Sequence, residues 1–333
     1  MINLSGHMPT LTIVMYHYVR PLKETAFPEI KGLDLDLFEG QLAYLSRNYT
    51  PVTMEHVIAV GRGEDHFPKN PVLLTFDDGY RDHHQYAFPL LEKYNIKGAF
   101  YPPTAAFLDH ELLDVNRVHF ILAAEPDTDK IVALLEAEID AARLNADIPS
   151  RSSLRSQHFK PFGYDTAEVI YIKRLLQHAL PENVRRTLAA KLFSAFVSVD
   201  EKDFANELYC SVAAMKEMSD AGHHIGSHGD RHCWLSRLSA SEQRNDIERS
   251  LRLFTALNLD KKDFTFCYPY GDHNDQSLEI LKSLGCAAAL TTKVGLAQVG
   301  RERMLILPRL DTNNLPKEAS AAANEWTEKS LNA

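Results

Sequence analysis

A short apolar stretch that ends at two adjacent carboxylates constrains this chain more than any other feature. Residues 72–76 (Val-Leu-Leu-Thr-Phe) are apolar or β-branched, and Pro71 and Gly79 bound the stretch. A run of this length and composition, with turn residues on both sides, predicts a buried strand. Asp77 and Asp78 are therefore expected at the end of a strand.

The two aspartates are expected to have different roles. Successive side chains of a strand point in opposite directions, so Asp77 and Asp78 can do the same job only if the chain turns between them. Gly79 permits such a turn. Asp-Gly is also a common loop dipeptide, so an ordinary acidic turn explains this stretch equally well when it is taken alone.

A second polar segment, residues 225–232, follows a short apolar stretch and contains His228 and His232. Their i, i+4 separation predicts that both imidazoles lie on one face of a helical turn. With Asp78 they supply one carboxylate and two imidazoles, which is the ligand set of open catalytic zinc sites. The chain has 15 histidines, so the pair is informative only together with Asp78.

Three segments, in this order, resemble the first three motifs of the polysaccharide deacetylase family, the group with the NodB-homology domain. They are residues 75–79 (Thr-Phe-Asp-Asp-Gly), 228–232 (His-Gly-Asp-Arg-His) and 266–271 (Phe-Cys-Tyr-Pro-Tyr-Gly). The resemblance covers roughly residues 11–104 and 207–311. It implies a distorted (β/α) barrel of about seven strands with functional groups at the carboxyl ends of the strands. The alternation of expected strands and helices alone predicts only an α/β fold with parallel βαβ units.

Residues 105–206 are predicted to form an all-helical insertion, because apolar residues recur there at helical spacing and strand signals are nearly absent. We therefore divide the chain into a barrel of residues 1–104 and 207–320, this insertion, and a C-terminal tail of residues 321–333. The insertion either enlarges the scaffold or forms a lid, a substrate wall or a subunit contact. The sequence leaves the oligomeric state open.

The expected chemistry follows from these groups. Hydrolysis of an acetamide needs a strong nucleophile, stabilisation of the oxyanion and a proton for the leaving nitrogen. A metal ion held by Asp78, His228 and His232 would lower the pKa of a water molecule toward ~7, and Asp77 would be the general base for that water. Zn²⁺ is the expected metal, although this ligand set also accepts Co²⁺, Ni²⁺ or Fe²⁺.

Substrate contacts are expected from the third motif. The resemblance implies that Pro269 and Tyr270 bind substrate, with a backbone N–H near Tyr270 completing the oxyanion pocket and its ring contacting the sugar. Taken alone, this segment is typical of an ordinary Pro-Gly turn.

The sequence departs from the family's pattern beside the base. Many members have an arginine just before the prolines of the third motif, where it braces the base, whereas this chain has Cys267 and Tyr268 there. Arg309, at an expected strand end, is the candidate replacement, and Asp311 beside it is a further candidate catalytic residue. A solvated surface pair explains Arg309 and Asp311 equally well.

A second departure concerns the general acid. Family members often take it from a late histidine, but no histidine follows His273 in this chain. His17, at the end of the first expected strand and so on the same barrel face, is the first candidate. His273, just beyond the third motif, is the second, and it is also a candidate substrate contact. His83 and His84 are interpreted as surface residues.

Composition argues against several other classes. The formal net charge of −9 disfavours nucleic acid or an anionic membrane surface as a partner, since both reward clustered Lys and Arg. No apolar run approaches the ~18 residues needed to span a bilayer. The apolar run at residues 11–19 is a poor signal peptide, so a cytoplasmic protein is expected. The four cysteines lack paired spacing and are expected to be packed thiols.

The sequence thus predicts a metal-dependent deacetylase that hydrolyses the N-acetyl group of an amino sugar in a glycan or glycoconjugate. Hydrolysis of a small non-sugar amide or cyclic imide is an alternative that the same metal and base would serve. A carbohydrate-binding protein with an impaired site is a second alternative, motivated by the two departures from the family's pattern.

Overall fold

The computed structural model describes residues 8–163 and 165–333, and the chain divides into two compact units. Unit 1 comprises Met1–Pro21, Gly32–His110 and Asn206–Ala333. Unit 2 comprises Leu22–Lys31 and Glu111–Ala205. Most of the predicted helical insertion therefore lies in unit 2, together with a short segment from near the N-terminus that the sequence analysis did not single out.

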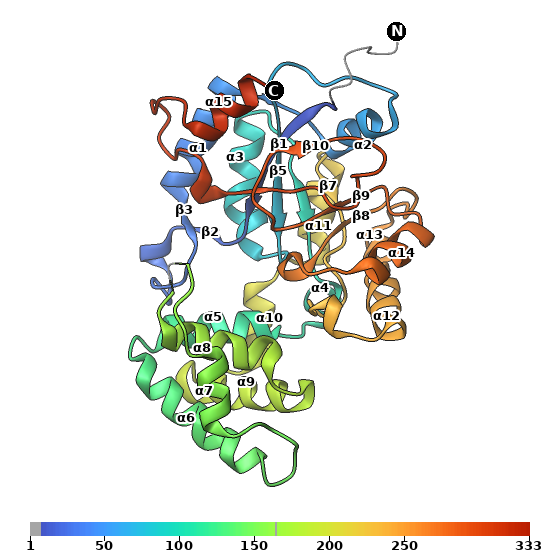
Figure 1. The fold of residues 1–333 in the computed structure, drawn as a ribbon. Coiled ribbons are helices and arrows are strands. Elements are labelled where there is room, and N and C mark those ends of the chain that lie inside the picture. Colours follow the sequence, from blue (N-terminus) through green and yellow to red (C-terminus); the bar gives the residue numbers. More distant parts are fainter. Residues whose placement is uncertain (1–7, 164) are drawn as a thin grey trace. The chain divides into compact units, whose positions relative to one another are not determined.

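The strands of the described chain all lie in unit 1 (Figure 1). They are β1 (Thr10–Tyr16), β2 (Val19–Arg20), β3 (Leu33–Asp34), β4 (Thr50–Pro51), β5 (Pro71–Asp77), β6 (Ala99–Tyr101), β7 (His224–Ile225), β8 (Thr265–Cys267), β9 (Ala288–Leu290), β10 (Ala297–Gln298) and β11 (Leu310–Asp311). The α-helices of this unit are α1 (Leu35–Asn48), α2 (Met54–Arg62), α3 (Phe88–Lys93), α4 (Thr104–Asp109), α11 (Val212–Asp220), α12 (Ala240–Ser250), α13 (Arg252–Leu257), α14 (Asp275–Ser283) and α15 (Glu325–Leu331).

The main sheet confirms the predicted α/β class. Strands β1, β5, β6 and β7 follow one another in the sheet and are parallel, and β4 and β11 pair in parallel with β5 and β1. The sheet is mixed, because β10 pairs with β1 in the antiparallel direction. Strands β8 and β9 form a separate parallel pair. Isolated parallel bridges join Ser227 to Phe266 and Leu290 to Leu307.

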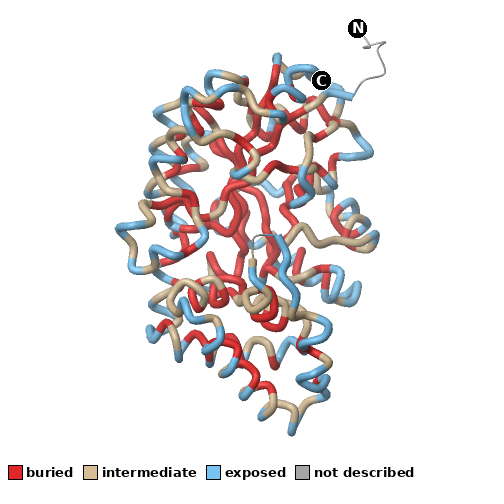
Figure 2. Tube along the Cα trace, turned by 60° about the vertical axis from the view of Figure 1, so that its left-hand side comes forward, coloured by how far each residue is buried: buried red, intermediate tan, exposed pale blue. Residues whose placement is uncertain are grey.

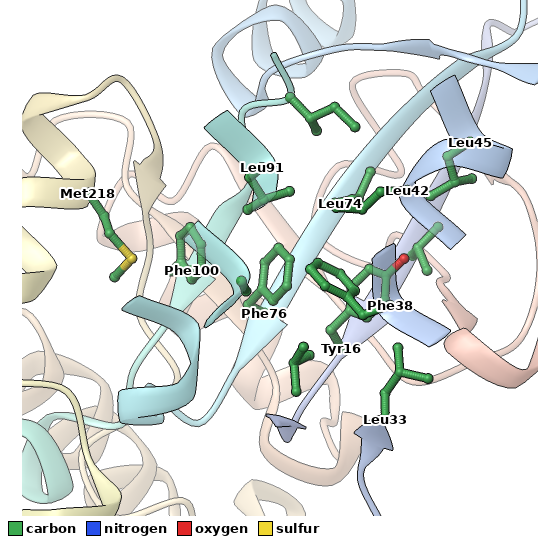
Figure 3. Packing of buried hydrophobic residues seen from close by; sticks show 14 of the residues in the cluster. Tyr16, Leu33, Phe38, Leu42, Leu45, Leu74, Phe76, Leu91, Phe100 and Met218 are labelled. Carbon is green, nitrogen blue, oxygen red and sulfur yellow. The ribbon is translucent and has the colours of Figure 1, made fainter. Parts of the chain in front are cut away.

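The central strands are buried on both faces, as Figure 2 shows and as expected for a parallel sheet covered by helices. Along β5, Leu74 and Phe76 belong to one apolar cluster, whereas Leu73 belongs to another. Figure 3 shows the first cluster, in which the Phe76 ring lies 5.0 Å from that of Tyr16 and 4.7 Å from that of Phe100. Strand alternation places Asp77 on the side of Leu73.

The second cluster explains how several strands deliver side chains to one place. Besides Leu73, it contains residues of five other strands, namely Leu11, Ile13, Ala99, Tyr101, Cys267, Ala288, Leu290 and Ala297. Asp77, at the carboxyl end of β5, thus extends the row of side chains that face this cluster.

Polar side chains cap the first turns of several helices in unit 1. Ser239 and Glu242 form a capping box at the start of α12. The side chains of Thr53 and Asn274 cap α2 and α14. At the C-terminus, α15 packs on unit 1, where the Tyr49 hydroxyl donates a 2.9 Å hydrogen bond to Thr327.

Unit 2 is built from helices over its described residues. These are α5 (Asp114–Ala124), α6 (Thr128–Ala142), α7 (Arg151–His158), α8 (Ala167–Arg174), α9 (Glu182–Phe196) and most of α10 (Glu201–Leu208). The rings of Phe27, Phe120 and Phe204 pack edge to face in its core. Within the described ranges of the chain, the structure has no helix that is long and apolar enough to cross a bilayer.

Candidate metal centre

The chain turns at Asp78, directly after β5. Asp78 and Gly79 have φ angles of 71° and 64°. A Cβ atom on Gly79 would lie 2.5 Å from Cβ of Pro102, so only glycine fits at this position without a shift. Asp77 still belongs to the strand, whereas Asp78 belongs to the turn, so the two side chains point in different directions.

The segment after β7 brings His228 and His232 to Asp78, but without a helix. Left-handed backbone at Gly229 (φ 75°) and His232 (φ 54°) folds the segment back, so the helical turn expected from the i, i+4 spacing is wrong. The two imidazole ring centroids are 4.8 Å apart. Their Nε2 atoms lie 3.5 Å and 3.3 Å from Oδ1 of Asp78.

The donor set fits a divalent cation. All three side chains are buried, and Oδ1 of Asp78 has no hydrogen-bond partner within the described part of the chain. Its other oxygen, Oδ2, accepts a 2.7 Å hydrogen bond from the Tyr80 hydroxyl. The candidate ligand atoms lie within 4.8 Å of one another, and one carboxylate with two imidazoles leaves further coordination positions open.

A hydrogen bond and burial set the tautomer and the protonation state of the two imidazoles. Nδ1 of His228 donates a 2.7 Å hydrogen bond to the carbonyl of Cys267, so in the neutral ring the lone pair is on Nε2, which faces Asp78. Burial lowers the pKa of His228 to about 4, with a further contribution from His232. Burial also lowers the pKa of His232 to about 3. Both rings are therefore neutral at pH 7, which is the form that binds a metal.

Asp77 is held by Arg309 in a buried ion pair. Nη1 and Nη2 of Arg309 donate to Oδ1 and Oδ2 of Asp77 at 2.8 Å and 2.7 Å. Burial alone would raise the pKa of Asp77, but the charge and hydrogen bonds of Arg309 outweigh it and hold that pKa well below its usual range. Arg309 is only 1% exposed, so the alternative of a solvated surface residue is wrong.

Cys267, which stands where many family members have an arginine and was expected to be a packed thiol, touches this ion pair. Its Sγ lies 3.1 Å from Nη2 of Arg309 and donates to Oδ2 of Asp77 at 3.5 Å. Burial raises the pKa of the thiol, so it is protonated at pH 7. Asp77, His228 and Cys267 form a second group of potential ligand atoms, but Arg309 already engages both oxygens of Asp77. The group with Asp78 fits a cation better.

The structure places His17 beside the base. Its Nε2 lies 3.8 Å from Oδ2 of Asp77, and its side chain is 39% exposed. The carbonyl of His17 accepts a 2.8 Å hydrogen bond from Nε2 of His83. His83 is fully buried against the rings of Phe76 and Phe100, so its interpretation as a surface residue is wrong.

Tyr270 lies next to His232, in the 3₁₀ turn Pro269–Gly271. Its backbone is left-handed (φ 58°), and its ring lies 4.6 Å from that of His232. The ring also stacks on Trp234, with centroids 4.5 Å apart. Trp234 was not singled out from the sequence, because nothing in its local pattern distinguishes it from a core residue.

Two other predicted site residues, His273 and Asp311, make contacts with nearby residues of the chain. Nδ1 of His273 hydrogen-bonds the carbonyl of Gly271 at 2.9 Å, and its ring stacks on Tyr268. The Asp311 carboxylate caps the short turn Thr312–Asn314, where it accepts a 2.8 Å hydrogen bond from a backbone N–H. These contacts hold both side chains in place, and the roles predicted for them at the site stay predictions.

The fold and the site define an α/β protein with an Asp-His-His cluster at the carboxyl ends of parallel strands. The family model described as "Polysaccharide deacetylase" matches residues 64–120 and 181–289. The chain belongs to the polysaccharide deacetylase family, whose members are hydrolases of carbon–nitrogen bonds other than peptide bonds.

Individual relatives agree with this assignment. The poly-β-1,6-N-acetyl-D-glucosamine N-deacetylase of Escherichia coli (strain K12) is 34% identical over 87 residues, which is 26% of this chain and 13% of that protein. The curated relatives are matched over 31% of their length or less.

Among solved structures, the deacetylase PplD of Streptococcus pyogenes, in complex with acetate, has a TM-score of 0.56 and 19% identity, covering 98% of both chains. IcaB from Ammonifex degensii has a TM-score of 0.54 and 16% identity, covering 97% of both. At these identities the likeness shows a shared fold.

Proposed function

We propose that this chain is a metal-dependent deacetylase that hydrolyses the N-acetyl group of an amino sugar in a glycan or glycoconjugate. One observation carries the proposal: Oδ1 of Asp78, buried and without a hydrogen-bond partner in the described chain, faces Nε2 of both His228 and His232 at 3.3–3.5 Å. The named activity of the Escherichia coli relative, removal of acetyl groups from a poly-N-acetylglucosamine, supports the substrate class.

Asp78, His228 and His232 would hold the cation, with Zn²⁺ as the proposed metal and Co²⁺, Ni²⁺ or Fe²⁺ as alternatives. A cation bound there would lower the pKa of a water molecule and polarise the acetyl carbonyl. That help is needed, because a carboxylate with the low pKa of Asp77 is ionised at pH 7 but is a weak base.

Asp77 would take the proton from the attacking water. Arg309 fixes the orientation of the Asp77 carboxylate through two hydrogen bonds. The buried Cys267 thiol donates a third hydrogen bond, to Oδ2 of Asp77. His17 would give a proton to the leaving nitrogen, since its ring is partly exposed and reaches to within 3.8 Å of Asp77. His273, whose ring is engaged by Gly271 and Tyr268, is the weaker candidate for this step.

Tyr270 would contact the sugar. It and Trp234 form a stacked aromatic pair next to His232, and aromatic rings with a polar group present an apolar face to a sugar ring together with a hydrogen-bonding tip. A backbone N–H near Tyr270, which follows Pro269 in the turn, would complete the oxyanion pocket.

We also propose that β1, β5, β6, β7, β8, β9 and β11 close into a distorted seven-stranded barrel. The two isolated bridges, Ser227 to Phe266 and Leu290 to Leu307, and the pairing of β11 with β1 support closure. Residues 105–206 are proposed to be an insertion into this barrel, with residues 1–104 and 207–320 as the barrel.

The test is acetate release from N-acetylglucosamine oligomers by the metal-loaded protein, with acetylated small amides and cyclic imides assayed in parallel. Asp77→Asn should keep the metal and lose turnover, whereas Asp78→Ala should lose the metal. Turnover of cyclic imides alone would reassign the substrate. Bound metal without turnover on any acetylated glycan would favour a binding protein over an enzyme.

A further inference from the structure

The segment that contains both imidazoles is held by a carboxylate from α12. The backbone N–H groups of Asp230 and Arg231 donate to Oδ2 and Oδ1 of Asp246, each at 3.1 Å. These two residues lie between His228 and His232 in the chain. One side chain thus fixes the part of the backbone that sets the distance between the two imidazoles.

Other contacts hold the same segment less directly. The N–H groups of Thr104 and Ala105 donate to the carbonyls of Gly229 and Asp230 at 3.0 Å and 2.9 Å. The Asp230 carboxylate accepts from Arg249 at 2.8 Å. Asp246 differs from these partners because it alone, within the described chain, bonds two consecutive N–H groups of this turn through both of its oxygens.

The turn and the carboxylate fit each other closely. Gly229 is left-handed, and a Cβ atom there would lie 2.8 Å from Oδ2 of Asp246. Asp246 is 6% exposed. Burying an ionisable group at this position is unfavourable unless its oxygens are bonded, and the bonds they make are those to the turn. A buried acid that serves only this turn indicates a requirement for a fixed turn geometry.

We propose that Asp246 is a positioning residue for the metal centre, which holds the His228–His232 turn in the geometry that lets both Nε2 atoms reach one cation with Asp78. The inference rests on the proposed function, because it takes these three side chains as the ligands. Groups that orient metal ligands from outside commonly contribute 10–100-fold to metal affinity.

The experiment measures the Kd for Zn²⁺ of the full chain by competition with a chromophoric chelator. Asp246→Ala removes both acceptors and should weaken Zn²⁺ binding by at least about tenfold. Asp246→Asn keeps one carbonyl oxygen and should fall between the wild type and the alanine variant. It also keeps the test available if Asp246→Ala does not fold.

Two control variants on the same helix separate positioning from general damage. Ile247→Ala removes a fully buried side chain, which packs in an apolar cluster other than the two clusters that contain the residues of β5. It should therefore lower the melting temperature without changing the Kd for Zn²⁺. Glu248→Gln changes an exposed residue paired with Arg244 and should change neither quantity. A loss of affinity in Ile247→Ala equal to that in Asp246→Ala would overturn the proposal.

The outcomes distinguish this inference from the proposed function. If the wild type binds Zn²⁺ and both Asp246 variants bind it equally tightly, the positioning role is wrong and the metal centre stands. If the wild type and Asp78→Ala both fail to bind Zn²⁺, the metal centre itself is wrong.

Discussion

Replacing Arg309 with methionine should destabilise the protein by about 3–5 kcal/mol, because it leaves Asp77 as an uncompensated buried charge. Both oxygens of Asp77 accept from Arg309, at 2.8 Å and 2.7 Å, and the two side chains are 2% exposed or less. Methionine keeps much of the length of the arginine and removes its charge and donors. The loss therefore reports the ion pair more than the packing.

A double-mutant cycle with Asp77→Asn measures the interaction free energy between Asp77 and Arg309. The double variant has no buried charge, so its loss should be smaller than the sum of the two single losses by about 1–3 kcal/mol. The assay is urea unfolding at pH 7 with a chelator present, followed by circular dichroism. Losses that add to within about 0.5 kcal/mol would show that the two side chains do not interact.

Three further predictions concern the core, the metal ligands and pH. Phe76→Ala should cost about 3–5 kcal/mol in urea unfolding, because the Phe76 ring is fully buried between Tyr16 and Phe100; a loss below about 1 kcal/mol would contradict this packing. Tyr80→Phe removes the hydrogen bond to Oδ2 of Asp78 and should weaken Zn²⁺ binding about 10–100-fold in a chelator competition; an unchanged Kd would show that Asp78 is oriented without it. Burial raises the pKa of Asp246 from 3.8 to about 6, so the folded protein binds a proton on this carboxylate more tightly than the unfolded chain does. The stability that protonated Asp246 contributes is therefore lost as pH rises from about 4 through 6. The stability of the wild type relative to Asp246→Asn should therefore fall by up to about 3 kcal/mol between pH 4 and pH 7, at about 1.4 kcal/mol per pH unit, and a difference that does not change with pH would contradict it.

Local patterns predict the elements that depend on nearby residues. The run before Asp77 forms β5, as predicted. Thr53, Ser239 and Asn274 cap helices, and all three are residue types that favour the N-cap position. The i, i+4 rule fails for the two histidines, because spacing alone does not reveal backbone conformation. The left-handed backbone of Gly229 and His232 brings the two imidazoles together instead.

The contacts that complete the site lie beyond local patterns. Asp77 meets Arg309 across 232 positions, and the sequence offers Arg309 only as a residue at an expected strand end. The burial of His83 depends on rings from β5 and β6 that no neighbouring residue reveals. Asp246 meets the turn only because α12 folds back on it.

The most direct test of the metal centre is anomalous diffraction from crystals of the protein grown with Zn²⁺. We predict a single strong peak about 2.0–2.2 Å from an Asp78 oxygen and from Nε2 of both His228 and His232. A peak held by Asp77 and Cys267, or no peak between Asp78 and the two imidazoles, would contradict the account.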